Sequence, residues 1–329
     1  AAGAGAPSTS AAPAAAAAGA GGRLTTGSVV LDGPLGGGLP RGLVTELVGE
    51  AGAGKSQLAL QLLLTAQWPE ERGGLAGRAL YIHTEGVDPT RRLRDLAARQ
   101  AERGLVGEDA CDHIFLEACL GGAEDLLRVL ERARGLAQRL GADGRPLRLL
   151  VVDSVGALFR DDVGGDGGRG GGEGGGEGAG GELRATPAGP RRVQLLFRVA
   201  QALRRLAAEF GLVVLVTNHV VDCVEGNLLH GLQTGNMRRL VTSGRCVTPA
   251  LGLHWAHCVH ARLFVSKTAL TLAQESAQAS GVVRRLQVAF APMWPPGECH
   301  FIISPVGVQG IPARFIPSGA SQGGAGAPV

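Results

Sequence analysis

Residues 49–56 read GEAGAGKS, and this stretch decides the fold. A glycine, four further residues and then Gly-Lys-Ser complete the phosphate-binding loop pattern. The glycines of the loop allow positive φ and a close approach of the backbone, so successive N–H groups can point at phosphate oxygens. The motif requires a strand before it and a helix after it, and the sequence predicts both, over 44–48 and 57–66. The stretch therefore predicts that the chain binds a nucleotide.

Two polar side chains of the loop have distinct chemical uses. Lys55 can reach the β- and γ-phosphates of a nucleoside triphosphate, and the Ser56 hydroxyl can ligate Mg²⁺. The helix that begins here directs about half a positive charge at the anion. A chance match is improbable, because the chain has 54 glycines but only two lysines, Lys55 and Lys267. The predicted nucleotide-contacting residues are Gly49, Glu50, Ala51, Gly52, Ala53, Gly54, Lys55, Ser56 and Gln57.

Composition narrows the class of protein. At 329 residues with 45% hydrophobic content, the chain is long enough for a globular body with a sizeable core. The net charge of +3 is mild, so any basic surface that binds nucleic acid must be local. The six cysteines never form a C-x-x-C pair, which predicts reduced thiols rather than a disulfide scaffold. No run approaches about 20 apolar residues, so neither a membrane span nor a membrane partner is expected.

From residue 23 onward, short apolar runs alternate with segments of helical periodicity, which is typical of an α/β fold. Further strands are predicted over 78–83, 113–116, 147–153 and 212–217, helices over 91–99, 124–140 and 192–210, and short strands with hairpins after 257. Two stretches interrupt this pattern: 13 of the 18 residues in 164–181 are glycine, and 222–249 reads as irregular. We expect one domain over 23–329 with two long loops, an Ala/Gly/Pro-rich tail over 1–22 and a second tail over about 316–329.

Polar residues lie at the ends of three predicted buried strands. Asp153 ends LRLLVVD, Glu85 lies in YIHTEG, and His219 lies in VLVTNHV. Because the carboxyl ends of parallel strands meet at one edge of a sheet, these side chains are expected beside the phosphate loop. There Asp153 can join the Mg²⁺ shell, and Glu85 can deprotonate a water in line with the γ-phosphate. A surface aspartate and a neighbour of a helix cap are the structural alternatives for Asp153 and Glu85.

Several blocks in order carry a resemblance to a known family. They are TTGSVVLDGPLGGGLPRGLVTELVGEAGAGKSQLALQL, RALYIHTEG, LLVVDSVGALFR, LVVLVTNHV and ALGLHWAHCVHARL. Over roughly residues 23–310 the chain resembles the RecA/Rad-type strand-exchange ATPases, and within them a eukaryotic recombinase paralogue. The resemblance implies a RecA-like P-loop ATPase core, with a largely parallel twisted sheet, flanking helices and C-terminal antiparallel strands. It also implies ATP and Mg²⁺ as cofactors, DNA-dependent ATP hydrolysis, and a role in homologous recombination and double-strand break repair.

The resemblance implies roles for individual residues of the ATP site. The catalytic positions correspond to Lys55 and Glu85, the Mg²⁺ positions to Ser56 and Asp153, and the γ-phosphate-sensing positions to His219 and His257. Arg92, in PTRRL, matches the arginine that lies against the adenine, and Pro292 is a candidate for the other side of the base.

Two segments match the family's DNA-gripping loops, residues 161–190 and 222–250. Basic residues lie in or beside them, and the predicted DNA contacts are Arg191, Arg192, Arg238, Arg239 and Arg245. Such charges can neutralise phosphates without reading bases. The partner we expect is DNA, single-stranded or branched. A solvated basic loop is the structural alternative.

The resemblance also implies protein partners. In the family a neighbouring subunit completes the ATP site, which predicts a complex with another Rad-type paralogue, the C-type one, and contact with the main recombinase filament. A nuclear location follows, with the cytoplasm as a second compartment and an organelle as the least expected.

Departures from the family pattern leave a second hypothesis open. His219 stands where the recombinases commonly have glutamine, His83 replaces a common acidic residue, and the glycine tract enlarges the first DNA segment. The helical N-terminal domain of filament-forming recombinases is not recognisable in 1–22, so self-polymerisation is not expected. The alternative is therefore a non-catalytic assembly factor for recombinase filaments that binds nucleotide as a structural clamp.

A zinc site is the other idea that this sequence raises. The residues concerned are Cys246, His254, His257, Cys258 and His260. If HWAHCVH is an extended strand, His254 faces away from His257, so the side chains do not converge and no zinc site is predicted.

Overall fold

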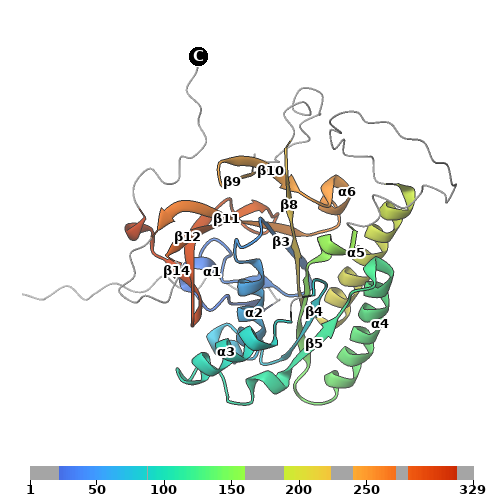
Figure 1. The fold of residues 1–329 in the computed structure, drawn as a ribbon. Helices are drawn as coiled ribbons and strands as arrows, with labels where there is room; N and C mark the ends of the chain where they lie inside the picture. The colour runs from blue at the N-terminus through green and yellow to red at the C-terminus, as the bar shows by residue number, and fades with distance from the viewer. Residues whose placement is uncertain (1–21, 87, 160–188, 224–239, 272–280, 317–329) are drawn as a thin grey trace, which may run out of the picture.

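A computed structural model describes residues 22–86, 88–159, 189–223, 240–271 and 281–316. Its centre is a nine-stranded sheet whose strands lie side by side in the order β14, β13, β12, β11, β3, β7, β6, β4, β5 (Figure 1). In that order the strands are Gly307–Ile311, Glu298–Ser304, Val282–Phe290, Ala261–Thr271, Val44–Gly49, Val213–Asn218, Leu147–Asp153, Arg78–His83 and Ile114–Ala118. Strands β11 to β5 pair in parallel and β12 to β14 antiparallel, which confirms the predicted RecA-like α/β fold.

Helices cover both faces of the sheet. One face packs against α1 (Val29–Asp32), α2 (Lys55–Thr65) and α3 (Thr90–Ala101), and the other against α4 (Gly122–Gly141), α5 (Pro190–Phe210) and α6 (Gly252–Ala256). Strand β6 shows why its sequence is continuously apolar: Leu149 and Val151 join the first core, whereas Leu150 and Val152 join the second. Successive side chains of a strand point to opposite faces, so a strand buried on both faces requires LLVV rather than alternation.

Smaller elements complete the described chain. Strand β1 (Arg23–Leu24) pairs with β2 (Leu39–Pro40), and a three-stranded sheet joins β8 (Val220–Asp222), β10 (Arg245–Pro249) and β9 (Leu240–Thr242). Short 3-10 turns are η1 (Glu70–Arg72), η2 (Ala110–His113), η3 (Val155–Phe159) and η6 (Ala313–Phe315). Within the described residues, no helix has the length and apolarity needed to cross a membrane.

Two sequence predictions need correction. The stretch 222–249 was expected to be irregular, but its described part ends in the β9–β10 hairpin, whose short strands give too little alternation for recognition. The HWAHCVH segment is not extended, because residues 252–256 form helix α6 and β11 begins only at Ala261. Among the described residues, His, Cys, Asp and Glu side chains form no group of three that could hold a metal. The six cysteines all lie within the described residues, and none of them is in a disulfide.

A buried ion pair links the central strands. Arg262 on β11 donates from Nε to Glu46 Oε2 on β3 at 2.6 Å, and the side chains are 6% and 0% exposed. Asn218, at the end of β7, donates from Nδ2 to the other oxygen of Glu46 at 2.8 Å. One carboxylate therefore holds three adjacent strands together just below the phosphate loop.

Replacing one partner of this pair is expected to be costly, because it leaves a buried charge without compensation. We predict that Arg262→Leu lowers the free energy of unfolding by about 3–5 kcal/mol in urea titration. The matched control is Arg285→Leu, which removes a longer and more exposed pair with Glu298 at 3.7 Å and should cost less. Equal losses in the two variants would contradict a special role for the buried pair.

Candidate nucleotide-binding site

The phosphate loop connects the end of β3 to the start of α2, as its sequence predicts. Gly52 and Gly54 have φ of +73° and +109°, in the left-handed region that favours glycine, and Gly54 is the N-cap of α2. At Gly49 a Cβ would lie 2.3 Å from the Val265 carbonyl oxygen on β11, so the loop can begin here only with glycine. The backbone therefore forms a cradle that side chains would fill, and it presents the N-terminus of an 11-residue helix to an anion.

Lys55 lies inside this cradle. Its Nζ donates to the carbonyl oxygens of Gly49 at 2.8 Å and Glu50 at 3.0 Å, and the residue is buried. The loop N–H groups can bind phosphate oxygens, and the Lys55 ammonium lies close enough to the loop to bind the same phosphates. The residues present thus fit a nucleoside triphosphate.

The predicted Mg²⁺ positions, Ser56 and Asp153, are connected through Tyr81 on β4. Tyr81 donates its hydroxyl to Asp153 Oδ2 at 2.5 Å and also shares a hydrogen bond with Ser56. Thr217 on β7 donates to the other oxygen of Asp153. Burial and the adjacent Asp153 carboxylate raise the pKa of Tyr81 far above its usual value, so the phenol stays a donor. A hard, oxygen-rich donor set of this kind fits Mg²⁺.

Glu85 and His219 come together at the same edge, although 134 residues separate them in the chain. His219 Nε2 lies 2.9 Å from Glu85 Oε1, and the Ser154 hydroxyl donates to the same oxygen at 3.4 Å. The order β3, β7, β6, β4 explains this meeting: Glu85 follows β4 and His219 follows β7, and only β6 lies between these two parallel strands. The predicted convergence of the strand ends is therefore present.

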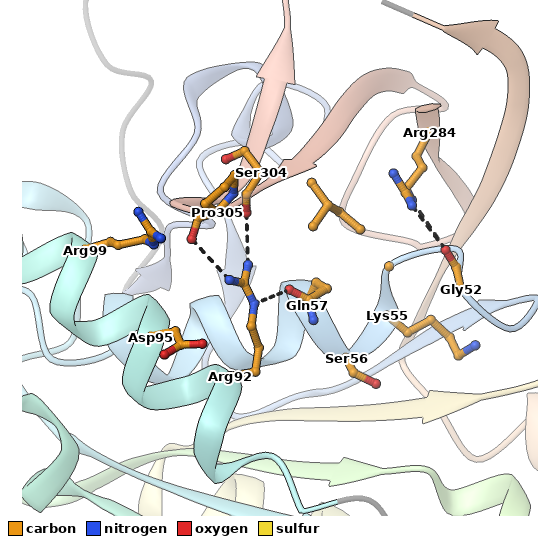
Figure 2. A pocket seen from close by; sticks show the side chains of 12 residues that line it. Gly52, Lys55, Ser56, Gln57, Arg92, Asp95, Arg99, Arg284, Ser304 and Pro305 are labelled. Atoms are coloured by element: carbon orange, nitrogen blue, oxygen red, sulfur yellow. Dashed lines mark hydrogen bonds between the residues drawn. The ribbon is translucent and has the colours of Figure 1, made fainter. Parts of the chain in front are cut away.

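A pocket of about 580 Å³ extends from the phosphate loop between α2, α3 and the β13–β14 turn (Figure 2). Arg92 of α3 lies in its wall, where Nε donates to Gln57 Oε1 at 2.8 Å. Its Nη1 and Nη2 donate to the carbonyl oxygens of Pro305 and Ser304 at 3.1 and 2.9 Å. All three contacts lie in the plane of the guanidinium, which fixes its flat faces for stacking with a base. Burial lowers the pKa of Arg92, but an arginine this basic stays charged.

The second wall of this pocket differs from the prediction. Pro292, the candidate for the far side of the base, is exposed and does not line the pocket, whereas Pro305 does. Pro292 follows β12, and Pro305 lies in the β13–β14 turn that Arg92 holds. Sequence spacing did not indicate Pro305, because its place in the pocket wall depends on how the C-terminal hairpins fold back.

The phosphate loop is flanked by two further cations, which the sequence analysis did not assign to the site. Arg284 on β12 lines the pocket and donates to the Gly52 carbonyl oxygen at 3.4 Å (Figure 2). Lys267 on β11 lies on the same side, since a Cβ at Gly52 would meet its Nζ at 3.2 Å. For Lys267, the rarity of lysine in this chain was the one sequence feature that could have indicated a role at the site. Arg284 is one of many arginines, so no sequence feature indicated it.

His257 does not reach the phosphate loop of its own chain. It follows α6, on the face opposite α2, and its carbonyl accepts a hydrogen bond from Arg204 of α5. Three residues later His260 pairs with Val44, the first residue of β3, whereas the loop follows the last residue of that strand. The γ-phosphate-sensing role of His257 therefore stays a prediction.

The predicted DNA contacts are only partly visible. Arg238 and Arg239, and nearly all of the first segment, lie outside the described residues. Arg191 pairs with Glu124 at 3.0 Å, and Arg245 pairs with Asp222 at 3.0 Å and Glu50 at 3.5 Å. Arg192 lies beside Arg191 in the first turn of α5, half-buried. Exposed ion pairs contribute little to stability, so phosphate groups can compete for these arginines.

Comparisons with known proteins agree with this geometry. The sequence pattern of the Rad51 family matches residues 22–172. The DNA repair protein XRCC3 homolog of Arabidopsis thaliana is 35% identical over 307 residues, covering 88% of this chain and 94% of that protein. DNA repair protein XRCC3 of Mus musculus is 36% identical over 301 residues, covering 88% and 76%. DNA repair protein RAD51 of Saccharomyces cerevisiae is 35% identical over 285 residues, covering 87% and 58%.

The resemblance that the sequence blocks carried is thereby confirmed. Identity above 30% over most of both chains, together with the nine-stranded sheet and its phosphate loop, leads to one conclusion. The chain belongs to the Rad51 family.

Proposed function

We propose that this protein is an ATP-binding, DNA-dependent ATPase that acts in homologous recombination and double-strand break repair as a recombinase paralogue. The observation that supports this most is the meeting of four groups at one sheet edge: Lys55, Ser56 with Asp153, Glu85, and His219. The XRCC3 and RAD51 relatives are named as DNA repair proteins, which supports the biological setting.

The proposed chemistry divides the work among these residues. The loop N–H groups and Lys55 bind the phosphates, and Ser56 and Asp153 hold Mg²⁺, which when bound neutralises phosphate charge. Glu85 orients a water and accepts its proton. His219, hydrogen-bonded to Glu85 at 2.9 Å, is placed to hold that carboxylate in position and to donate toward a γ-phosphate.

Partners complete the proposal. The neighbour that brings its own histidine to the ATP site is another Rad-type paralogue, the C-type one, and the assembly acts on the main recombinase filament and on DNA in the nucleus. The position of His257, remote from its own loop, supports a site shared between subunits. We further propose one ATPase domain over 23–329, with the DNA-contacting segments at 161–190 and 222–250.

Steady-state ATP hydrolysis with and without single-stranded DNA tests the enzyme. Lys55→Ala is expected to abolish nucleotide binding and turnover, because it removes the ammonium that the loop carbonyls hold and that can reach the β- and γ-phosphates. Arg139→Ala, an exposed cation on α4, is the control and should leave both unchanged. Turnover that persists in Lys55→Ala would contradict the proposed site, whereas wild-type binding without turnover would support the non-catalytic clamp instead.

Glu85→Gln separates binding from chemistry. The amide keeps the size of the side chain but cannot accept a proton, so we expect ATP affinity within about threefold of wild type and hydrolysis slowed at least about tenfold. Single-turnover measurements with bound ATP report the chemical step directly. Equal single-turnover rates would remove Glu85 from its role.

The DNA segments are tested through salt dependence. Each phosphate contact to a single strand contributes about 0.7 to the slope of log affinity against log salt. We predict that Arg238→Ala/Arg239→Ala weakens single-strand binding and flattens this slope by about 1.4. The matched control is Arg103→Ala/Arg139→Ala, two exposed arginines that lie just after α3 and on α4, and should leave the slope unchanged. The same slope in all three proteins would place the DNA contact elsewhere.

A further inference from the structure

The β9–β10 hairpin lies against the strand that leads into the phosphate loop. Leu240 of β9 and Val247 of β10 pack against Val48 and Phe264 in a small buried cluster. Val48 immediately precedes the first residue of the loop, and Figure 1 shows the hairpin above β3 and β11. A displacement of the chain at Val48 would therefore disturb the packing of Leu240 and Val247 at the base of the hairpin.

The turn of the hairpin rests on one loop side chain, that of Glu50. Ser243 and Gly244 form the turn with φ of +49° and +76°, the positive pair that a tight two-residue hairpin requires. Thr242 and Ser243 both donate their hydroxyls to Glu50 Oε1 at 2.8 Å. Arg245 Nη2 lies 3.5 Å from Glu50 Oε2. Three of the four residues from 242 to 245 thus converge on one carboxylate.

Glu50 is held as an anion in this place. Its side chain is only 11% exposed, and the backbone N–H of Lys267 on β11 also donates to it. Burial raises the pKa of Glu50, but the hydrogen bonds from Thr242 and Ser243 and the charge of Lys267 outweigh it, so the pKa lies below its ordinary value. The contact is therefore a set of charge-assisted hydrogen bonds, which are stronger than neutral ones.

The same residue also touches the nucleotide side of the loop. The backbone carbonyl of Glu50 accepts a hydrogen bond from Lys55 Nζ at 3.0 Å. Phosphate oxygens that take up Lys55 compete for this bond, and the carbonyl lies only a few covalent bonds from the carboxylate that the hairpin holds. The backbone carbonyl of Glu50 thus contacts the Lys55 ammonium, and its carboxylate contacts the hairpin.

We propose that Glu50 couples the nucleotide state of the phosphate loop to the β9–β10 hairpin and, through it, to Arg245. The idea rests on the proposed nucleotide binding, but it concerns how that site is regulated. Hairpin side chains, not only residues that touch ATP, then set how strongly nucleotide and hairpin influence each other.

Hydrogen exchange of the backbone amides of residues 240–249 tests this, with and without Mg²⁺ and the non-hydrolysable analogue AMP-PNP. In the wild type, bound nucleotide should change hairpin exchange rates at least about fivefold, the lower end of typical coupling between sites. Thr242→Val/Ser243→Ala removes both hydroxyl donors while keeping side-chain size, and should reduce this change to less than about twofold. The control is Thr248→Val, on the part of β10 that pairs with β8, and it should behave as wild type.

The possible results distinguish nucleotide binding itself from its coupling to the hairpin. Nucleotide affinity, measured in parallel, should stay within about fivefold of wild type in all variants. If AMP-PNP binds but the wild-type hairpin does not respond, or if the double variant responds as the wild type does, the coupling is wrong and the proposed ATP site stands. If wild-type protein binds no nucleotide, both the proposed function and the coupling fail.

Discussion

The parallel hydrogen bonding of β3 between β11 and β7 is the constraint on which the rest of the structure depends. Val48 pairs with Asn218 on one side, and Gly49 pairs with Val265 on the other. This register sets where the chain leaves the sheet, and the 2.3 Å approach of Val265 to a Cβ at position 49 fixes glycine there. The buried Glu46 carboxylate reinforces the same three strands with side-chain bonds. A shift of one residue in this register would move the phosphate loop and reverse the faces of β3 together.

The sheet order also places positive and negative side chains on opposite sides of the phosphate loop. On one side of β3 lie β11 and β12, which contribute Lys267 and Arg284; on the other lie β6 and β4, whose ends carry Asp153 and lead to Glu85. A triphosphate over the end of β3 would have cations along one flank and carboxylates along the other. The first flank suits phosphate oxygens, and the second suits a metal ion and a polarised water. One strand order thus separates the cations from the carboxylates.

Much of this could be predicted from the sequence, and the limits have physical causes. Strands 78–83 and 147–153 were predicted with their observed bounds, because an apolar run can be recognised from the local sequence alone. The convergence of Asp153, Glu85 and His219 followed from the rule on parallel strand ends. Tyr81, Lys267 and Arg284 were missed because their value depends on cross-strand register, which no local pattern encodes. For the same reason Pro305 was not considered beside Pro292, and the short strands of the β9–β10 hairpin were read as irregular.

Tyr81 is the single tyrosine of the chain, and it is buried between the two groups assigned to Mg²⁺. Its phenol oxygen contacts Asp153 and Ser56 at once, so its electronic environment depends on what those two groups bind. Incorporation of fluorotyrosine would give one fluorine resonance, without assignment and without a foreign label on the surface. The fold thus places one labelled tyrosine beside the proposed Mg²⁺ position, where the fluorine shift would respond to binding of Mg²⁺ or nucleotide even when no turnover occurs.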